Sequence, residues 1–202
     1  MRIITVANLK GGCGKTTLTR NLAVCAGKRA AIIDLDLQGT LSDWLQARTA
    51  DYPTLIQGIT PATLHSALQR LSGAFKWVFV DTPPANHGWI GEVMGLSDLV
   101  LIPVKPSPDD LRAVGETLYL LEEAKQDNFV FVLNQAIGRA RITDQAARVL
   151  AQHGRVAPVT INYRVAFQQA AGHLGVTEQH KDKKSAEEIT DLWKYVKKLL
   201  EK

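Results

Sequence analysis

The stretch that decides the fold is Lys10-Gly11-Gly12-Cys13-Gly14-Lys15-Thr16-Thr17. It follows a short apolar run at residues 3–6 and precedes residues 17–27, which have the pattern of a helix. Glycines allow the backbone to curl so that its N–H groups point inward at phosphate oxygens, and the start of a helix adds a partial positive charge. A strand, a glycine-rich loop and a helix in this order predict a phosphate-binding loop.

Two side chains of this loop carry the expected chemistry. Lys15 can reach the β- and γ-phosphates of a nucleotide, and the Thr16 hydroxyl can coordinate Mg²⁺. The loop departs from the usual G-x-x-x-x-G-K-[ST] pattern, because Leu9 stands where the first glycine is expected. A second lysine, Lys10, can fold back on its own nucleotide or reach one held by another subunit. The alternative is a solvated lysine beside a chance glycine cluster.

Carboxylates follow two further apolar runs. Residues 30–33 lead into Asp34 and Asp36, which share a face on a strand, and residues 77–80 lead into Asp81. A short apolar run closed by Asp is typical of a buried parallel strand that delivers a carboxylate to the end of a sheet. There it can hold the hydration shell of Mg²⁺. The alternative, a helix N-cap, is disfavoured for Asp36 and Asp81 and stays open for Asp34.

Together these motifs resemble those of the ParA/MinD family of ATPases with a deviant Walker A loop, and among them the short ParA proteins that partition plasmids. The resemblance is carried by K-G-G-C-G-K-T-T at 10–17, D-L-D-L-Q-G at 34–39 and V-F-V-D-T-P-P at 78–84. Two further motifs are similar more weakly: Ile102-Pro103 with Pro106-Ser107-Pro108, and Ile161-x-x-Arg164-x-x-Phe167-x-x-Ala170. The resemblance covers residues 1 to about 175 and implies ATP and Mg²⁺ as ligands.

The resemblance also implies roles for single residues. Lys15 would bind the β- and γ-phosphates, and Lys10 would cross into the partner's site of a nucleotide-sandwich dimer. Asp36 would position or polarise the attacking water, while Thr16 and Asp81 would hold Mg²⁺, Asp81 through water. The nucleotide-binding set would comprise Lys10, Gly11, Gly12, Cys13, Gly14, Lys15, Thr16, Thr17 and Asn134.

Three members of that set have particular assignments. Thr17 would lie near the α-phosphate. Asn134, after the apolar run at 129–133, matches a position that often contacts adenine; its alternative is a turn residue at the end of a strand. Cys13 occupies a variable position for a small residue and is assigned no chemistry.

The order of elements predicts an α/β fold: one P-loop NTPase domain over residues 1–202, with a mainly parallel sheet flanked by helices on both faces. Residues 49–60 show no pattern and are interpreted as a loop over the sheet edge. Strands are expected near 2–7, 30–34, 77–81, 98–104, 128–134 and 156–161. Helices are expected near 15–27, 41–47, 61–72, 109–125, 142–153, 164–172 and 185–201.

Composition is typical of one cytoplasmic domain. The chain has 202 residues, 46% of them hydrophobic, which is enough for one sizeable core. The N-terminal apolar stretch is too short for a signal peptide, and no apolar run approaches the roughly 20 residues that span a bilayer. The two cysteines have no metal-site spacing, and Cys25 is expected in the core.

Basic residues gather in one segment. The net charge is +4, and residues 139–164 hold five arginines and one acid. Such clustering favours sequence-independent contact with DNA phosphates, and a solvated face with partners elsewhere is the alternative. The candidates for DNA contact are Arg164, Arg148 and Arg155, while Arg139 and Arg141 are expected nearer the nucleotide.

The C-terminal segment, residues 185–202, predicts an amphipathic helix. Ser185 and Glu188 have the spacing of a capping box. The helix could pack against the domain or, as in MinD-type relatives, bind a membrane; packing is favoured because acids dilute its basic charge. Residues 180–184 are expected to form a solvated linker. The apolar stripe consists of Ile189, Leu192, Trp193, Val196, Leu199 and Leu200, with Lys194, Lys197, Lys198 and Lys202 among them.

The resulting hypothesis is a DNA-partitioning ATPase. An ATP-bound homodimer would bind non-specific DNA on the nucleoid, and hydrolysis, accelerated by a centromere-binding ParB-like protein, would release it. A MinD-like ATPase at the membrane and a ParA-like positioner of a protein cargo are alternatives. A third is a metabolic phosphotransferase whose acceptor pocket would come from residues 82–95, including His87 and Trp89.

Overall fold

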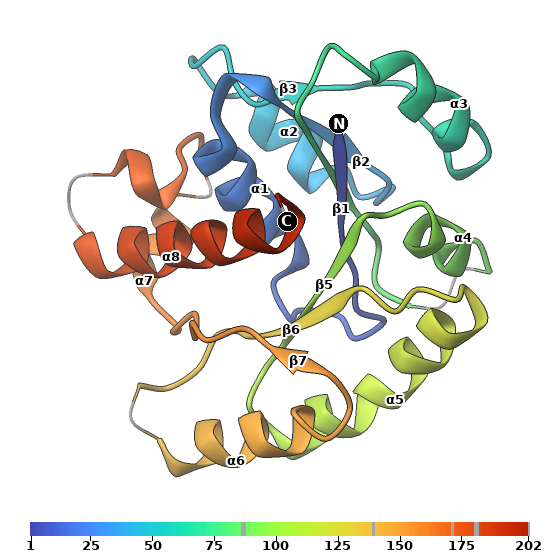
Figure 1. Ribbon diagram of the computed structural model, residues 1–202. Helices are drawn as coiled ribbons and strands as arrows, with labels where there is room; N and C mark the ends of the chain where they lie inside the picture. Colours follow the sequence, from blue (N-terminus) through green and yellow to red (C-terminus); the bar gives the residue numbers. More distant parts are fainter. Residues whose placement is uncertain (86–87, 139, 171, 180–181, 202) are drawn as a thin grey trace.

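The strand pairings among the described residues are all parallel. The computed structural model describes residues 1–85, 88–138, 140–170, 172–179 and 182–201. One seven-stranded sheet has the order β3-β2-β4-β1-β5-β6-β7 (Figure 1). The strands are β1 (Arg2–Val6), β2 (Ala30–Asp34), β3 (Thr54–Leu55), β4 (Trp77–Asp81), β5 (Leu99–Val104), β6 (Phe129–Leu133) and β7 (Arg155–Val156).

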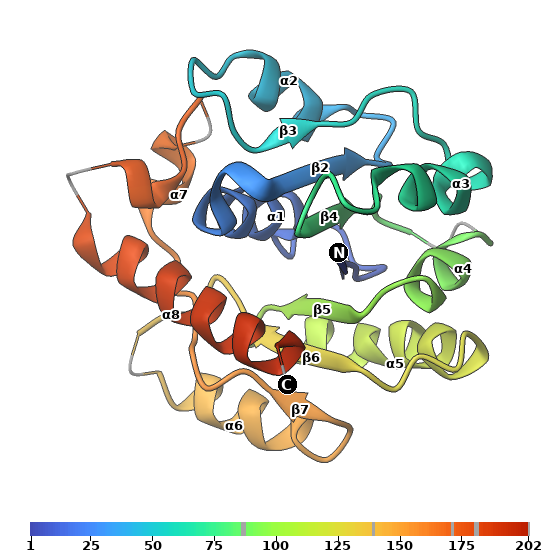
Figure 2. The same ribbon diagram turned by 45° about the horizontal axis from the view of Figure 1, so that its top comes forward.

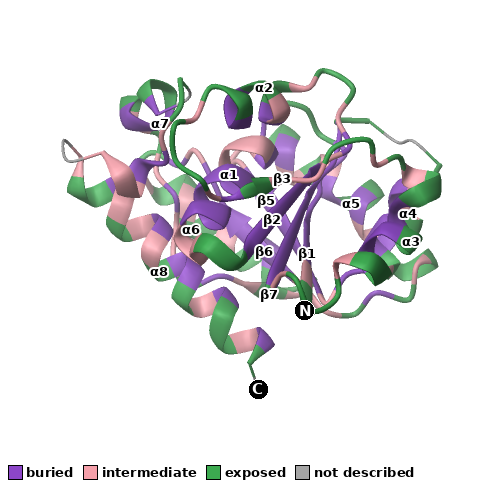
Figure 3. Cartoon of the chain, turned by 90° about the horizontal axis from the view of Figure 1, so that it is seen from above, coloured by how far each residue is buried: buried purple, intermediate pink, exposed green. Residues whose placement is uncertain are grey.

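Helices cover both faces of the sheet, as Figure 2 shows with α1, α7 and α8 on one side and α3, α4 and α5 on the other. The inner strands are buried on both faces because each face has its own apolar cluster (Figure 3). The predicted α/β architecture is confirmed. The helices are α1 (Lys15–Ala26), α2 (Thr40–Gln46), α3 (Pro61–Leu71), α4 (Ile90–Gly95), α5 (Pro108–Glu123), α6 (Arg141–Leu150), α7 (Val165–Gln169) and α8 (Lys183–Leu200), with 3₁₀ turns at Gly27–Arg29 and Val176–Glu178.

Three expectations about single elements were wrong. The segment 49–60 is not only a loop, because it contains β3, the outermost strand beside β2. The strand expected at 156–161 is only β7, since Pro158 lacks the N–H that would continue the ladder. The segment 82–95, considered as an acceptor pocket, contains α4, whose Ile90 and Met94 are buried in the core. His87 lies outside the described residues, as do Arg139, residues 180–181 and Lys202.

The C-terminal helix α8 packs against the domain. Its Ile189, Leu192 and Val196 are fully buried in the cluster that α1 and the sheet share, so the apolar stripe is already used by the core. The capping-box prediction was wrong: α8 begins two residues earlier, and Asp182 accepts hydrogen bonds from the first-turn N–H groups. The Glu188 side chain therefore does not cap α8 and can contact other residues.

Among the described residues, no helix has the length and apolar character needed to cross a membrane.

Candidate functional site

The glycine-rich loop joins the carboxyl end of β1 to the start of α1. Because β1 lies between β4 and β5, the loop stands near the middle of the sheet. Gly12 and Gly14 have φ angles of 71° and 92°, which side chains other than glycine rarely tolerate. The loop is therefore curled as the sequence predicts, with the N-terminus of a helix directly behind it.

The two lysines of the loop differ in exposure. Lys15 is buried, and its ammonium donates hydrogen bonds to the carbonyl oxygens of Asn8 at 2.9 Å and Lys10 at 3.2 Å. Lys10 is exposed, and its ammonium makes no hydrogen bond or ion pair within the described part of the chain. Lys15 is thus placed inside its own loop, whereas the Lys10 side chain is available to reach outward.

Asp81 ends β4 behind the loop and is fully buried. Its carboxylate accepts hydrogen bonds from the hydroxyl groups of Thr16 at 2.7 Å and Thr19 at 2.9 Å. Burial raises the pKa of Asp81 to about 7, the Asp34 carboxylate adds to the rise, and the two hydroxyl groups and Lys15 oppose it. The predicted metal-binding pair, Thr16 and Asp81, is therefore brought into direct contact.

Asp34 is the last residue of β2, and Asp36 lies in the loop that follows it. Asp36 lines a small pocket of about 200 Å³ together with Lys15 and Thr16, on the open side of the loop. Asp34 accepts hydrogen bonds from the N–H of Asp36 and from both the N–H and the hydroxyl of Ser42 in the first turn of α2. Asp34 thus satisfies an N–H in the first turn of α2, although the N-cap residue of this helix is Gly39.

A second pocket, of about 380 Å³, adjoins the phosphate loop. It is lined by Thr16 and Thr17 of the loop and, among others, by Asn134, Tyr163 and Phe167. Its position next to the loop, its size and its mixture of apolar and amide groups suit a nucleoside. The predicted contact of Asn134 with adenine stays a prediction, although this residue does line the pocket.

Asn134 also has a role that sequence reasoning missed. Its amide donates to the Cys13 carbonyl at 2.6 Å, and the neighbouring Gln135 amide donates to the Gly12 carbonyl at 2.9 Å. The end of β6 therefore holds the loop in its curled form. Only the placement of two amide residues directly after an apolar run hinted at this.

Asn8 and Arg20 were also missed. Asn8 fixes the base of the loop: its side chain accepts from the Lys10 N–H and donates to the Pro103 carbonyl. Arg20 lines the second pocket, and burial lowers its pKa to about 10. The sequence feature that could have pointed to Arg20 is its position one helical turn after Thr16. Cys13 is buried, which raises the pKa of its thiol and fits the absence of assigned chemistry.

The described arginines Arg148, Arg155 and Arg164 lie on different elements of the fold. Arg155 lies opposite Val130 near the start of β6 and donates to Asn128, whereas Arg164 follows β7 beyond the other end of the strand. Arg164 pairs with Glu188 at 2.6 Å, and this hydrogen bond raises the pKa of the guanidinium. Arg148 is exposed on α6. Arg155 and Arg164 thus have partners within the chain, and the contact of Arg164, Arg148 and Arg155 with DNA stays a prediction.

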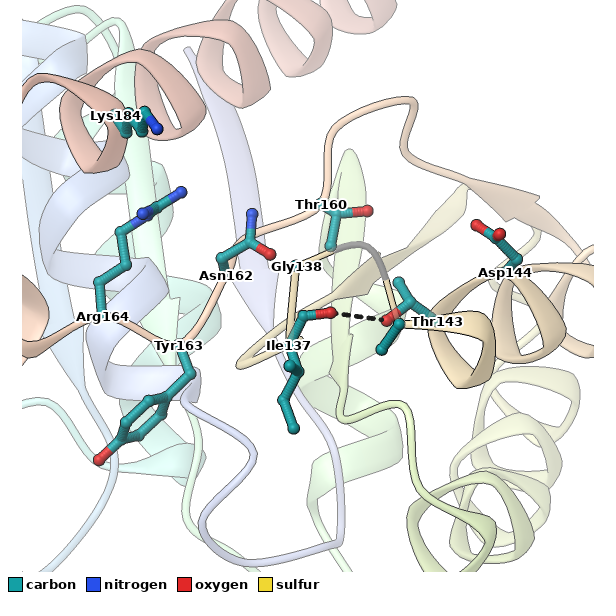
Figure 4. Close-up of a pocket in the computed structure, with 10 residues that line it drawn as sticks. Ile137, Gly138, Thr143, Asp144, Thr160, Asn162, Tyr163, Arg164 and Lys184 are labelled. Atoms are coloured by element: carbon teal, nitrogen blue, oxygen red, sulfur yellow. Dashed lines mark hydrogen bonds between the residues drawn. The ribbon is translucent and has the colours of Figure 1, made fainter.

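A wider depression of about 710 Å³ lies beside the second pocket and shares Asn162, Tyr163 and Arg164 with it. Figure 4 shows Arg164 extending toward the helix that bears Lys184, and Ile137 and Thr143 on the opposite side of the depression. Residues 162–164 thus form a wall between the 380 Å³ pocket and the 710 Å³ depression.

The residues of the site fit a nucleoside triphosphate with Mg²⁺. The loop supplies a curled backbone and a lysine, which suit phosphate oxygens. The Thr16 hydroxyl and the Asp81 carboxylate are both oxygen donors, the kind that Mg²⁺ prefers, and few carboxylates are needed because phosphates and waters complete its shell.

The loop geometry makes Gly14 irreplaceable. We expect Gly14→Ala to lower the free energy of unfolding by about 1–3 kcal/mol and to weaken ATP binding strongly. A Cβ at this position collides with the Asn134 amide and must also adopt a φ of 92°. Chemical unfolding and ATP titration measure the two effects. Gly73→Ala is the control, because Gly73 has a φ of 91° but open space around it; equal behaviour of the two variants would contradict the expectation.

Comparison with known proteins identifies relatives over most of the chain. Residues 4–174 match the model of the CobQ/CobB/MinD/ParA nucleotide binding domain. The maintenance of carboxysome distribution protein A of Halothiobacillus neapolitanus is 36% identical over 151 residues, which are 69% of each chain. The chromosome-partitioning ATPase Soj of Thermus thermophilus is 31% identical over 157 residues, covering 62% of this chain and 63% of Soj.

The fold also has a close counterpart among solved structures. The crystal structure of the cell division ATPase MinD of Pyrococcus furiosus matches with a TM-score of 0.80 at 22% identity, covering 98% of this chain and 99% of that one. At this level of identity the likeness concerns the fold, and it confirms the expected P-loop architecture.

Proposed function

The chain belongs to the CobQ/CobB/MinD/ParA family of nucleotide-binding ATPases, and from this premise we propose that it positions a protein cargo through cycles of ATP-dependent dimerisation. The observation that carries the proposal is the contrast between the two lysines of the loop. A buried Lys15 serves the nucleotide of its own subunit, and an exposed, unpaired Lys10 is available to a nucleotide in a second subunit. A monomeric phosphotransferase has no need of the second lysine.

The proposed reaction is hydrolysis of ATP to ADP and phosphate. Lys15 exchanges its two carbonyl partners for the β- and γ-phosphates, and Lys10 of each subunit reaches the phosphates in the other. Asp36, on the open side of the phosphate pocket, orients the water that attacks the γ-phosphate in line. Thr16 and Asp81 would hold Mg²⁺, which neutralises charge that develops on the phosphate oxygens.

Loss of the γ-phosphate links ATP hydrolysis to the opening of the dimer. The sandwich dimer depends on phosphates that both subunits contact, so removal of one phosphate weakens the contact and opens the dimer. The described residues include no arginine directed at the phosphate pocket, so turnover of the isolated chain is expected to be slow. A partner protein would accelerate it.

Similarity favours a protein cargo over DNA. The relative with 36% identity is named for carboxysome distribution, whereas the chromosome-partitioning relative is 31% identical over a smaller share of the chain. The cargo proposed for this chain is accordingly a protein assembly, with the nucleoid as the surface on which the ATP-bound dimer is retained.

DNA partitioning, with a ParB-like partner, is the second candidate, and the exposed arginines of α6 favour it. Arg141 and Arg148 are both exposed on this helix, and neither has an ion-pair partner among the described residues. Contact with DNA phosphates through α6 would serve either candidate, since both require a nucleoid-bound dimer. The identity of the cargo is what separates them.

Two measurements test the proposed function. Light scattering with ADP, ATP or a non-hydrolysable ATP analogue is expected to show a dimer only with the triphosphates. Binding of a random-sequence duplex at two salt concentrations is expected in the same states only, and to weaken at higher salt. A monomer in all nucleotide states would contradict the proposal.

The cargo is tested in cells that lack the gene. A protein cargo predicts normal inheritance of DNA, scored as anucleate cells and plasmid loss. It also predicts clustering of the assembly that co-purifies with the ATP-bound chain, scored by fluorescence imaging. DNA loss without such clustering would favour the partitioning candidate.

A further inference from the structure

We propose that Glu188 of α8 is a positioning residue for nucleotide binding, because its carboxylate holds the pocket wall formed by Asn162, Tyr163 and Arg164. The inference rests on the proposed nucleotide site. It gives the C-terminal helix a function in that site beyond its packing in the core.

The contacts of Glu188 are concentrated on this wall. Its carboxylate accepts hydrogen bonds from the Asn162 N–H at 3.1 Å and the Asn162 amide at 2.7 Å. It also accepts from the Arg164 guanidinium at 2.6 Å, with a longer contact to Nε at 3.5 Å. Both backbone and side chain of the wall are therefore held by one carboxylate, while Tyr163 between them is left exposed to the pocket.

The environment makes this clamp effective. The Glu188 and Arg164 side chains are only 14% and 26% exposed, so water competes weakly for their hydrogen bonds. Loss of the carboxylate would leave the Arg164 charge and two Asn162 donors without their partner. The cost of unpaired donors would be relieved by movement of the wall, for which the described residues provide one β-bridge, Ala136–Asn162.

A second contact holds the same wall farther along the chain. The Arg20 guanidinium of α1 donates to the Phe167 carbonyl at 2.8 Å, and Phe167 lines the same pocket. Residues 162–167 are thus held by α1, which begins at the phosphate loop, and by α8. Because α8 does not contribute to the phosphate loop, a substitution of Glu188 should disturb the nucleoside pocket and leave the phosphate pocket intact.

The geometry predicts a selective effect. Asn162, Tyr163 and Arg164 line the nucleoside pocket, whereas the smaller phosphate pocket is lined by Lys15, Thr16 and their neighbours. A displaced wall should weaken ligands that carry a nucleoside and spare a ligand that consists of phosphates only. General destabilisation would weaken both ligands.

The test is calorimetric titration of the full chain with ADP and with inorganic tripolyphosphate, each with Mg²⁺. We expect Glu188→Gln to weaken ADP binding about tenfold and to leave tripolyphosphate binding unchanged. Glu188→Asp, which keeps the charge on a shorter side chain, should recover part of the loss. Glu187→Gln is the matched control, because Glu187 is exposed on the same helix and its side chain makes no hydrogen bond within the described residues. Thermal unfolding of each variant accompanies the titrations.

Each other outcome overturns the inference. Unchanged ADP binding by Glu188→Gln would show that the clamp does not position the pocket. Parallel loss of ADP and tripolyphosphate binding, or an equal loss in Glu187→Gln, would assign Glu188 a general structural role. A wild-type chain that binds neither ligand would overturn the nucleotide site itself, which distinguishes failure of the proposed function from failure of this inference.

Discussion

Replacement of Lys15 by glutamine is expected to reduce ATP hydrolysis by about 10²-fold or more. The Lys15 ammonium is the only cation that the described structure buries inside the phosphate loop, 2.9 Å and 3.2 Å from two loop carbonyls. In the proposed reaction it moves to the β- and γ-phosphates and stabilises the charge that develops there. Glutamine keeps a donor for the carbonyls, so the loop should stay folded while the charge is lost.

Steady-state phosphate release and ATP titration measure this effect. Lys28→Gln is the control, since Lys28 is exposed in the turn after α1. Hydrolysis by Lys15→Gln within a few-fold of wild type would exclude Lys15 from the reaction and place the triphosphate elsewhere.

Replacement of Lys10 by alanine is expected to abolish ATP-dependent dimerisation and, with it, most hydrolysis. The exposed Lys10 ammonium has no partner in its own subunit within the described residues, so its removal should cost the monomer little stability. The sandwich dimer, however, would lose a charged contact to the phosphates in each of its two sites. The effect should therefore fall on assembly rather than on the first binding of ATP.

Light scattering with a non-hydrolysable ATP analogue, beside titration of the monomer with ADP, separates the two steps. Lys10→Ala should bind ADP like wild type and stay monomeric with the analogue, while Lys28→Ala should dimerise normally. A Lys10→Ala variant that dimerises and hydrolyses ATP at the wild-type rate would favour a monomeric phosphotransferase.

Residues 139–164 show that basic residues clustered along the sequence need not be clustered in the folded structure. Five arginines between residues 139 and 164 favoured contact with DNA, although the sequence could not place them on one face. The fold places Arg155 beside the start of β6 and Arg164 beyond its other end, where Arg164 pairs with Glu188, 24 residues farther along the chain. Sequence spacing could not reveal that partner, because the pairing depends on how α8 returns to the sheet.

The same limit applies to the end of the chain. Ser185 and Glu188 have the spacing of a capping box, a local pattern that the sequence displays fully. In the structure Asp182 occupies the cap, and tertiary packing directs Glu188 to the wall of the pocket. A local rule was overridden by a contact between segments that the sequence separates.

The sequence alone was enough to predict the phosphate loop, the strands that end in Asp34 and Asp81, and the α/β class of the fold. These features are local: a glycine pattern sets the curl of a loop, and an apolar run closed by a carboxylate sets a buried strand. Tertiary structure alone decided which side chains hold the loop and the pocket. Asn134, Arg20 and Glu188 act through contacts over 121, 147 and 24 residues, and such contacts form only when the strands and helices pack.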